Sequence, residues 1–591
     1  MRQRRKNKMI IMSLLGFLFL MTVGYAAFQT NLKIKGTSSI SSNWDIRITN
    51  VTEGNKTGDA ESAKAPTWDK LTANVEANLY QKGDSIEYII TVENKGTIDA
   101  FLSNITTNET KHEAIKFTVE GPNSNDKLFK GESTRIKVKI EYNPEFNGVP
   151  EVGSSELNIT LDYVQAVVAG NEILNPNLYV SSTGNDKTGV GSTTNPYKTL
   201  QKAYEEAGSE ATIYIMDDIT QTETFNLNEN KNITLTSYGV NQPYSVKKEK
   251  DYGTYMFIVQ KGQLTLDNII IDGENLDSKY GLIDLLGGVK LVTQNNTTLK
   301  NAVSSIRCGG AISARDNENV TIEINNTTID NNSSLCSGAM HLGTSTNTVI
   351  NSGTISNNKT LTDAGGGIGN FGQLTINNAN ITGNNAKKTG GGIYNAGTTT
   401  FKGGTIQQNK ANNGAGIMVN TVNGSNPTLT INGGQILNNT STSTGGGIYS
   451  SDNTTINIIS GKISGNKSEN NNGGGIHSGG IVNMSGGEIS GNSTNHQGGG
   501  ITHCSHKLFT MTGGIIANNT SPGAGAGVHL IGPFILDGGT IKNNTSTSTT
   551  AGGGISRNQY LDYNGSYTYK SGIVCENVPT NIFETATTCP N

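Results

Sequence analysis

The chain has 591 residues, too many for a single compact core, so it must contain two or three domains or a repeat that grows in one dimension. Its 44 Lys and Arg residues nearly balance 48 Asp and Glu residues, which leaves a formal charge of −4. Beyond the N-terminus no stretch gathers basic residues into a patch that could neutralise phosphates. The charge pattern therefore argues against nucleic acid as a partner.

The N-terminal segment has the layout of an export signal. Basic residues open the chain, an apolar run over residues 9–28 follows, and small residues stand at its end: Arg2, Arg4, Arg5, Lys6, Lys8, Ala26 and Ala27. The alternative is an uncleaved anchor, because about 20 apolar residues are just long enough to cross a bilayer. In both cases we expect the remainder of the chain to be extracellular, either secreted or associated with the cell surface. The membrane would be reached only through residues 1–28, if they stay uncleaved.

Residues 29–168 are predicted to form a β-sandwich. Apolar and polar residues alternate over residues 85–93 and 133–142, and this period of two is typical of half-buried strands. Several such strands at short spacing, separated by turn sequences, favour an immunoglobulin-like or jelly-roll-like fold with two sheets. No catalytic constellation is visible in this segment.

Two motifs link the N-terminal part to a known group of exported proteins. They are Gly24-Tyr-Ala-Ala-Phe-Gln-Thr and Ser41-Ser-Asn-Trp-Asp-Ile-Arg-Ile. The segment resembles camelysin and TasA-type proteins over about the first 165 residues. This resemblance implies a Gram-positive cell-surface or biofilm-matrix protein with a jelly-roll-like sandwich. Camelysin-type proteins have been discussed as proteases, but His112 is the only histidine before residue 300, so a zinc-binding pair does not carry over.

The C-terminal half is a repeat. Ten copies of Gly-Gly-Gly-Ile or a close variant recur at intervals of 24 to 31 residues. Their apolar residues are Ile312, Met340, Ile368, Ile393, Ile417, Ile448, Ile476, Ile501, Val528 and Ile555.

Two further patterns fill each repeat. One has an apolar residue followed three positions later by Asn, from Ile329 with Asn332 to Ile541 with Asn544. The other is an apolar pair two residues apart, such as Leu374 with Ile376. Three short strands per repeat cannot bury their apolar faces alone, but stacked coils can, each adding about 4.8 Å along an axis. The pattern predicts a right-handed parallel β-helix in which the glycines shape turns and the asparagines share hydrogen bonds between coils.

The segment before the repeat resembles the opening of pectin-lyase-like β-helix domains. It reads Leu178-Tyr-Val-Ser-Ser-Thr-Gly-Asn-Asp and then Asn195-Pro-Tyr-Lys-Thr-Leu-Gln-Lys-Ala-Tyr-Glu-Glu-Ala. The resemblance implies a strand, a loop and a short helix that caps the first coil. The repeat itself is similar to those of polymorphic outer-membrane proteins and related adhesins. We therefore expect a cap and first coils over residues 169–300, and repeat coils with a C-terminal cap over residues 301–591.

Proteins of this fold include lyases, hydrolases and adhesins, so activity must be argued from side chains. Glycoside hydrolysis needs two carboxylates about 5 to 10 Å apart. After residue 300 we find no repeated column of acids: Asp363 is followed at equivalent positions by Lys388, Asn412 and Ser443. Lys462 and Glu488 occupy equivalent places in adjacent coils, where a surface ion pair explains them better than an acid/base pair. The sequence thus predicts no catalytic residue and no cofactor.

One group of side chains could bind a metal. His477 and His529 both follow the apolar residue of the repeat, and Cys504 and His506 lie between them. Three imidazoles and a thiol can coordinate zinc. The alternative, which we favour, is an exposed stack of ring side chains, because Tyr394 and Tyr449 occupy the same column as the two histidines.

The five cysteines favour disulfides outside the cytoplasm. Cys308 and Cys336 each stand four residues before the apolar residue of their repeat, so stacking in register brings their Cα atoms about 5 Å apart, which suits a disulfide. Cys575 and Cys589 are predicted to close a C-terminal loop, which leaves Cys504 unpaired.

These patterns predict an adhesin-like protein of the cell surface or biofilm matrix. It would bind an extracellular glycan or surface protein through the face of the β-helix, without catalysis. The alternative prediction is a polysaccharide lyase or glycoside hydrolase whose acids meet on loops that the repeat does not align.

Overall fold

The computed structural model describes residues 44–582 except 110–112, 124–125, 148–156, 166, 170–171, 240–241, 549–551 and 558–565. The predicted signal at residues 1–28 lies outside the described residues. Within them no helix is long and apolar enough to cross a membrane. The chain separates into two compact units, one of residues 1–179 with 185–197 and 206–208, the other holding the remainder.

The first unit consists of antiparallel sheets. One sheet has the order β1 (Ile46–Thr57), β4 (Ser85–Asn94), β8 (Ser133–Tyr142) and β6 (Ile115–Glu120). A second contains β7 (Lys127–Leu128), β5 (Ala100–Glu109) and β9 (Leu157–Gln165), and β2 (Glu61–Trp68) pairs with β3 (Ala73–Asn78). Val92 and Ile136 of the first sheet pack with Leu128 and Leu161 of the second. The predicted alternation is thus confirmed, because its apolar residues form the core between the two sheets.

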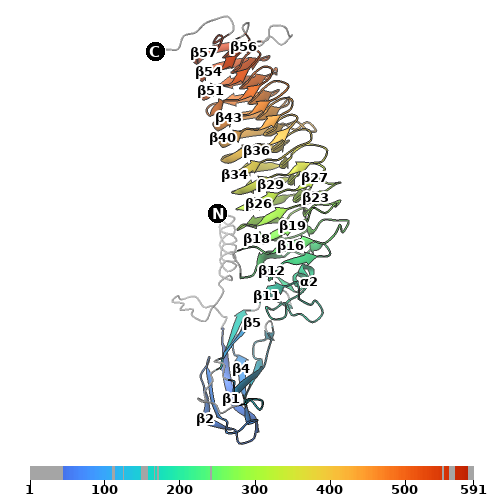
Figure 1. The fold of residues 1–591 in the computed structure, drawn as a ribbon, viewed down its shortest axis with the longest axis vertical. Helices are drawn as coiled ribbons and strands as arrows, with labels where there is room; N and C mark the ends of the chain where they lie inside the picture. Colours follow the sequence, from blue (N-terminus) through green and yellow to red (C-terminus); the bar gives the residue numbers. More distant parts are fainter. Residues whose placement is uncertain are drawn as a thin grey trace, which may run out of the picture. The chain divides into compact units, whose positions relative to one another are not determined.

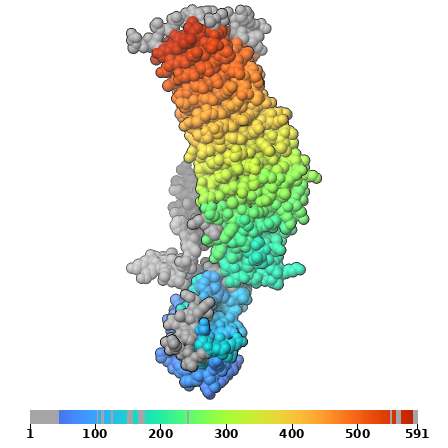
Figure 2. Space-filling view, in the orientation of Figure 1, coloured from blue at the N-terminus to red at the C-terminus, as the bar shows by residue number. Residues whose placement is uncertain are grey.

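The second unit is a right-handed parallel β-solenoid of about 12 turns (Figure 1). In the space-filling view successive coils lie as narrow bands across the solenoid (Figure 2). One regular coil contains β35 (Ile393–Asn395), β36 (Thr398–Phe401), β37 (Gly404–Gln407) and β38 (Lys410–Ala411), and the next begins at β39 (Ile417–Val419). The predicted parallel β-helix is confirmed.

The ten short strands that carry the Gly-Gly-Gly-Ile motif lie in one wall, a sheet of 13 strands whose first three lack the motif. The 13 strands are β14 (Phe225–Leu227), β17 (Phe257–Val259), β20 (Ile283–Leu285), β24 (Ile312–Ala314), β28 (Met340–Leu342), β32 (Ile368–Asn370), β35, β39, β42 (Ile448–Ser450), β45 (Ile476–Ser478), β49 (Ile501–His503), β53 (Val528–Leu530) and β56 (Ile555–Arg557). Register places Ile368 beside Ile393 and Ile393 beside Ile417, and all three are fully buried. The ten repeat residues therefore form one continuous apolar column.

The predicted asparagine stack runs through the interior. The side-chain amide of Asn409 donates to Oδ1 of Asn439 at 2.9 Å, and that of Asn439 donates to Oδ1 of Asn466 at 2.9 Å. Each amide also donates to a main-chain carbonyl of the preceding coil, as Asn439 does to Ile406. The same arrangement links Asn332, Asn358, Asn384, Asn409, Asn439, Asn466, Asn492, Asn519, Asn544 and Asn577. These asparagines are structural, as predicted, because their amides are fully used between coils.

The segment that was predicted to be helical forms the short helix α2 (Leu200–Glu205). Its Leu200, Ala203 and Tyr204 are buried. The Tyr204 ring meets Phe225 of β14 edge to face, with ring centres 5.6 Å apart. The helix thus packs against the first strand of the 13-stranded wall.

Candidate functional site

Titratable and ring side chains gather on the outer side of the 13-stranded wall. The middle residue of each three-residue strand points away from the interior, because its two neighbours point inward. This outer column holds Asp284, Ser313, His341, Tyr394, Tyr449, His477 and His529. The 26-stranded sheet forms the long wall, whose outer columns include uncharged residues such as Thr398, Thr428 and Thr455. The 13-stranded wall therefore combines titratable and ring side chains in one column.

Asp284 is the acid of this column. It stands between Ile283 and Leu285 of β20, which fix it by pointing into the core, and it is 0% exposed. Arg315, just after β24 in the next coil, donates from Nε to Oδ1 of Asp284 at 3.4 Å and from Nη2 to Oδ2. The arginine side chain is 55% exposed, so it covers the acid from the solvent side.

Two tyrosine rings border Asp284. The ring centres of Tyr255 and Tyr280 lie 5.3 Å apart. Burial, and then the nearby charge of Asp284, raise the pKa of Tyr255 to about 12, so its phenol stays protonated at neutral pH. Tyr255 also hydrogen-bonds Ser313, the residue beside Asp284 in the next coil. The acid thus has an aromatic wall on the side of the two preceding coils.

A second carboxylate lies close by. Glu318, in the turn after β24, rests against Gly287, three residues beyond Asp284: a Cβ added to Gly287 would lie 2.6 Å from Oε2 of Glu318. Burial is the largest cause that raises the pKa of Asp284, and the charge of Glu318 adds to it, while Arg315 and Arg307 act in the opposite direction. Two carboxylates, one buried with a raised pKa, are the groups that glycoside hydrolysis uses.

Sequence comparison missed Asp284 because acids were compared only after residue 300. The motif around it, Tyr280-Gly-Leu-Ile-Asp, keeps only one of the three glycines. A signal was nevertheless present, since Ile283 precedes Ile312 by 29 residues, which falls within the range of the regular repeat.

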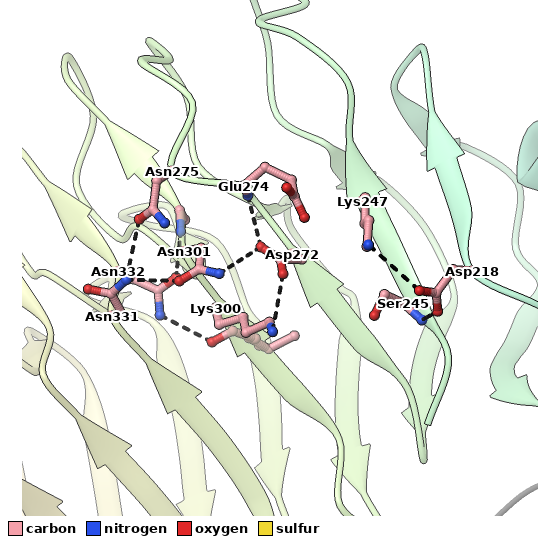
Figure 3. A network of polar contacts seen from close by, with 12 residues as sticks. Asp218, Ser245, Lys247, Asp272, Glu274, Asn275, Lys300, Asn301, Asn331 and Asn332 are labelled. Carbon is pink, nitrogen blue, oxygen red and sulfur yellow. Dashed lines mark hydrogen bonds and ion pairs between the residues drawn. The ribbon is translucent and has the colours of Figure 1, made fainter. Parts of the chain in front are cut away.

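A different charged network lies on the long wall (Figure 3). Lys247 of β16 (Ser245–Lys248), Asp272 of β19 (Ile270–Asp272), Lys300 of β22 (Thr298–Lys300) and Asp330 of β26 (Thr327–Asp330) occupy one column with alternating sign. Figure 3 shows Asp272 held by Lys300, by the amide of Asn301 at 2.9 Å and by the main-chain N–H of Glu274 at 2.8 Å. Its carboxylate is fully engaged, so this network links the first coils and leaves no group for catalysis.

The group predicted as a possible zinc site is not assembled. Thr502 lies between His477 and His529 in register, while Cys504 and His506 are exposed beyond the end of β49. Over residues 44–582, apart from the gaps given above, no three His, Cys, Asp or Glu side chains are grouped to hold a metal ion. The favoured alternative holds for Tyr449 and His477, whose rings stack with centres 5.0 Å apart.

The predicted exposure of that ring column is wrong. His529 is 2% exposed, and His477 is only partly exposed. The reason is that the glycine turns pack closely against the two histidines. A Cβ added to Gly473 would lie 2.8 Å from Cβ of His477, and a Cβ added to Gly525 would lie 2.8 Å from Cα of His529. Only glycine lets the turn approach the column so closely.

The structure also contains other predicted pairs of side chains. Lys462 and Glu488 form an ion pair at 3.0 Å with both side chains partly exposed, as expected. Cys308 and Cys336 form the predicted disulfide, with Cα atoms 4.6 Å apart, and Cys504 is free and exposed. Cys575 ends β57 (Tyr567–Cys575), but Cys589 lies outside the described residues, so their pairing stays a prediction.

Removing the Cys308–Cys336 disulfide is expected to lower the free energy of unfolding by about 3 kcal/mol, because the bond closes a 28-residue loop. The double variant Cys308→Ser/Cys336→Ser, followed by urea unfolding, measures this. Reduced wild-type protein should match the reduced double variant. Cys504→Ser is the control, and it should unfold like the wild type with and without reductant.

No protein-family model and no characterised protein sequence matches the chain. Solved structures do match. The catalytic domain of a GH87 alpha-1,3-glucanase in complex with nigerose is 12% identical over 90% of this chain and 99% of that chain, with a TM-score of 0.35. A variant of that domain in complex with tetrasaccharides matches over the same shares with a TM-score of 0.36. These values are too low to transfer residues or a substrate, so the site is argued from this chain's own side chains.

The prediction of a non-catalytic adhesin is wrong in the light of these matches. The solved structures that match the chain are catalytic domains of glucanases. The acids after residue 300 form no column in the regular repeat, whereas Asp284 stands in a coil before it.

Proposed function

We propose that the solenoid is a glycoside hydrolase that acts on an extracellular polysaccharide, with Asp284 and Glu318 as its reacting carboxylates. The observation that carries this proposal is a fully buried carboxyl group with a raised pKa near a second carboxylate from the next coil. The Cys308–Cys336 disulfide is consistent with an extracellular site of action.

The two acids have different environments, as acid–base catalysis requires. Burial favours the protonated form of Asp284, and Arg315 favours the ionised form, so the group can both give and regain a proton. In our proposal Asp284 protonates the glycosidic oxygen while Glu318, half-buried at the surface, activates water or attacks the sugar. Arg315 must leave Asp284 when the sugar enters, and Tyr280 offers the face of its ring to the sugar.

The test is the release of reducing ends from a panel of neutral α- and β-glucans, pectins, glycosaminoglycans and bacterial exopolysaccharides. Asp284→Asn and Glu318→Gln should each lower the rate on a cleaved glycan by about 100-fold or more, because each removes an acid–base group. Asp363→Asn is the matched control, since Asp363 is exposed and pairs only with Lys388 at the surface. It should leave the rate unchanged.

Two results would contradict the proposal. If the wild-type protein releases no reducing ends from any glycan, the solenoid is not a hydrolase of these substrates. If it does, but both variants keep the wild-type rate, then the reacting carboxylates lie elsewhere. Unsaturated products would instead identify a lyase.

A further inference from the structure

A buried lysine lies behind the aromatic side of the Asp284 site. Lys248, the last residue of β16, is 3% exposed. Its Nζ donates to Oγ of Ser278 at 2.7 Å and to the carbonyl oxygen of Tyr280 at 3.3 Å. The ring centre of Tyr252 is 5.3 Å from Nζ. The ammonium group therefore contacts two successive coils at once.

Asp251 completes this cluster, which we call the lysine node (Lys248, Asp251 and Ser278). The carboxylate of Asp251 accepts from Oγ of Ser278 at 3.1 Å and from the main-chain N–H of Gly253 at 3.0 Å. It also accepts from the main-chain N–H of Lys279. The node thus joins the turn over residues 249–256 to the turn over residues 273–282.

A third coil is tied to the same place. The hydroxyl of Tyr252 donates to the carbonyl of Gln221, and the side-chain amide of Gln221 donates to the carbonyl of Met256 at 2.8 Å. In regular coils a tight turn with a ladder asparagine occupies this place, and main-chain register holds it. The two turns here carry Glu249 and Glu274 where the regular coils have the stacked asparagine, so a buried side-chain cluster takes over the role of fixing them.

These two turns carry the rings beside Asp284. Tyr255 follows Asp251 by four residues, and Tyr280 is the residue whose carbonyl Lys248 holds. Because each ring belongs to one of these turns, the lysine node determines the positions of the Tyr255 and Tyr280 rings beside Asp284. A methionine of similar length would fill the same volume without the desolvation that a buried ammonium group costs, so packing alone does not require a lysine.

We propose that Lys248 is a positioning residue of the Asp284 site: through Ser278 and Asp251 it fixes the turns that hold Tyr255 and Tyr280 against the sugar. The inference rests on the hydrolase proposed above for its kinetic consequence. The anchoring of the turns is a separate claim with its own measurement.

The lysine node should also determine the pH above which activity falls. Burial lowers the pKa of Lys248, and the charge of Asp251 opposes that shift. The other groups that face Lys248 do not compete: burial raises the pKa of Tyr252 to about 12, and Asp272 in the next strand is engaged by Lys300. A neutral amine still reaches Ser278 but no longer attracts Asp251. Activity should therefore fall at a lower pH than the titration of an ordinary lysine would give.

The experiment compares Lys248→Met, Lys248→Arg and the control Lys250→Met in the full chain. Lys250 lies in the same turn but is exposed and contacts only Glu249, at 4.0 Å. Hydrogen exchange of peptides spanning residues 249–256 and 273–282 reports on the turns without any substrate. Initial rates on the glycan that the wild type cleaves best report on the reaction.

In Lys248→Met we expect faster exchange in both turns and unchanged exchange in the coil over residues 393–416. The kcat should fall by about 100-fold, since misplacement of about 1 Å costs that much. Lys248→Arg should restore most of kcat and raise the pH above which activity falls. Lys250→Met should match the wild type in both measurements.

The two claims fail in different ways. Unchanged exchange in Lys248→Met overturns the inference whether or not any glycan is cleaved. Faster exchange with a kcat within twofold of the wild type overturns the positioning role. If the wild type cleaves nothing, the hydrolase proposal fails, and so does the kinetic part of this inference, while exchange still decides whether Lys248 anchors the turns.

Discussion

Replacing Asn439 with alanine will lower the free energy of unfolding by about 3 kcal/mol or more, because it leaves several buried polar groups without partners. Oδ1 of Asn439 accepts from the main-chain N–H of Asn409 at 3.0 Å and from its side-chain amide at 2.9 Å. Its own amide donates to Ile406 and to Asn466. Water cannot replace these bonds easily, since all four residues are buried here. Urea unfolding followed by far-ultraviolet circular dichroism measures the change.

The matched control is Asn432→Ala, seven residues earlier in the same coil. Asn432 is exposed, and its Oδ1 accepts only a long bond of 3.4 Å from Ser460. Its substitution should change the free energy of unfolding by less than about 0.5 kcal/mol. Equal effects of the two substitutions would show that an asparagine of the interior stack stabilises the fold no more than an ordinary surface amide does.

Acidification will destabilise the C-terminal coils well above the pH at which carboxylates titrate. Burial lowers the pKa of both His477 and His529 to about 4, below the ordinary value of 6.5. In this pH range the unfolded chain binds protons that the folded chain does not bind. The free energy of unfolding therefore falls as the pH drops from about 6.5 toward 4. Between pH 7 and pH 5 the loss should be about 2 kcal/mol for each histidine. Unfolding in urea at a series of pH values measures it.

His477→Phe and His529→Leu remove the titrating rings while keeping buried apolar volume. Both variants together should reduce the pH dependence between pH 7 and pH 5, and the remainder belongs to groups such as His341 and His503, whose pKa values burial also lowers. His506→Gln, at an exposed position, should leave that dependence intact. A wild-type protein equally stable at pH 7 and pH 5 would show that the two imidazoles are not held neutral.

The architecture follows from the sequence because one repeat unit specifies one coil. Ile393 and its equivalents had to share a column once the coils stacked, and so did the asparagines, since a fixed offset within a repeat becomes a fixed position on the axis. The same logic gave the pairing of Cys308 with Cys336. Periodicity therefore predicts whatever is repeated.

The candidate site could not be predicted in this way, because it is built where the repeat is broken. Lys248 and Asp284 lie in coils with few motif glycines and without the stacked asparagine, so the motifs that define the repeat do not mark these coils. Glu318 is brought to Asp284 by a turn between strands of the next coil, a contact that depends on the absence of a Cβ at Gly287. The burial of His529 was missed for a similar reason, since it depends on how closely a glycine turn folds back.

The asparagine ladder points in one direction. Every side-chain bond between two of these asparagines is donated toward the C-terminus, and the last is donated by Asn577 to Asn581, only four residues away. The stack therefore closes on a short local loop instead of needing a special partner at its end. Each stacked asparagine makes the same bonds to the asparagines before and after it. A whole coil can therefore be added or removed without leaving a donor or acceptor unpaired. The length of such a solenoid can thus change by duplication or loss of single repeats, while the irregular first coils stay as they are.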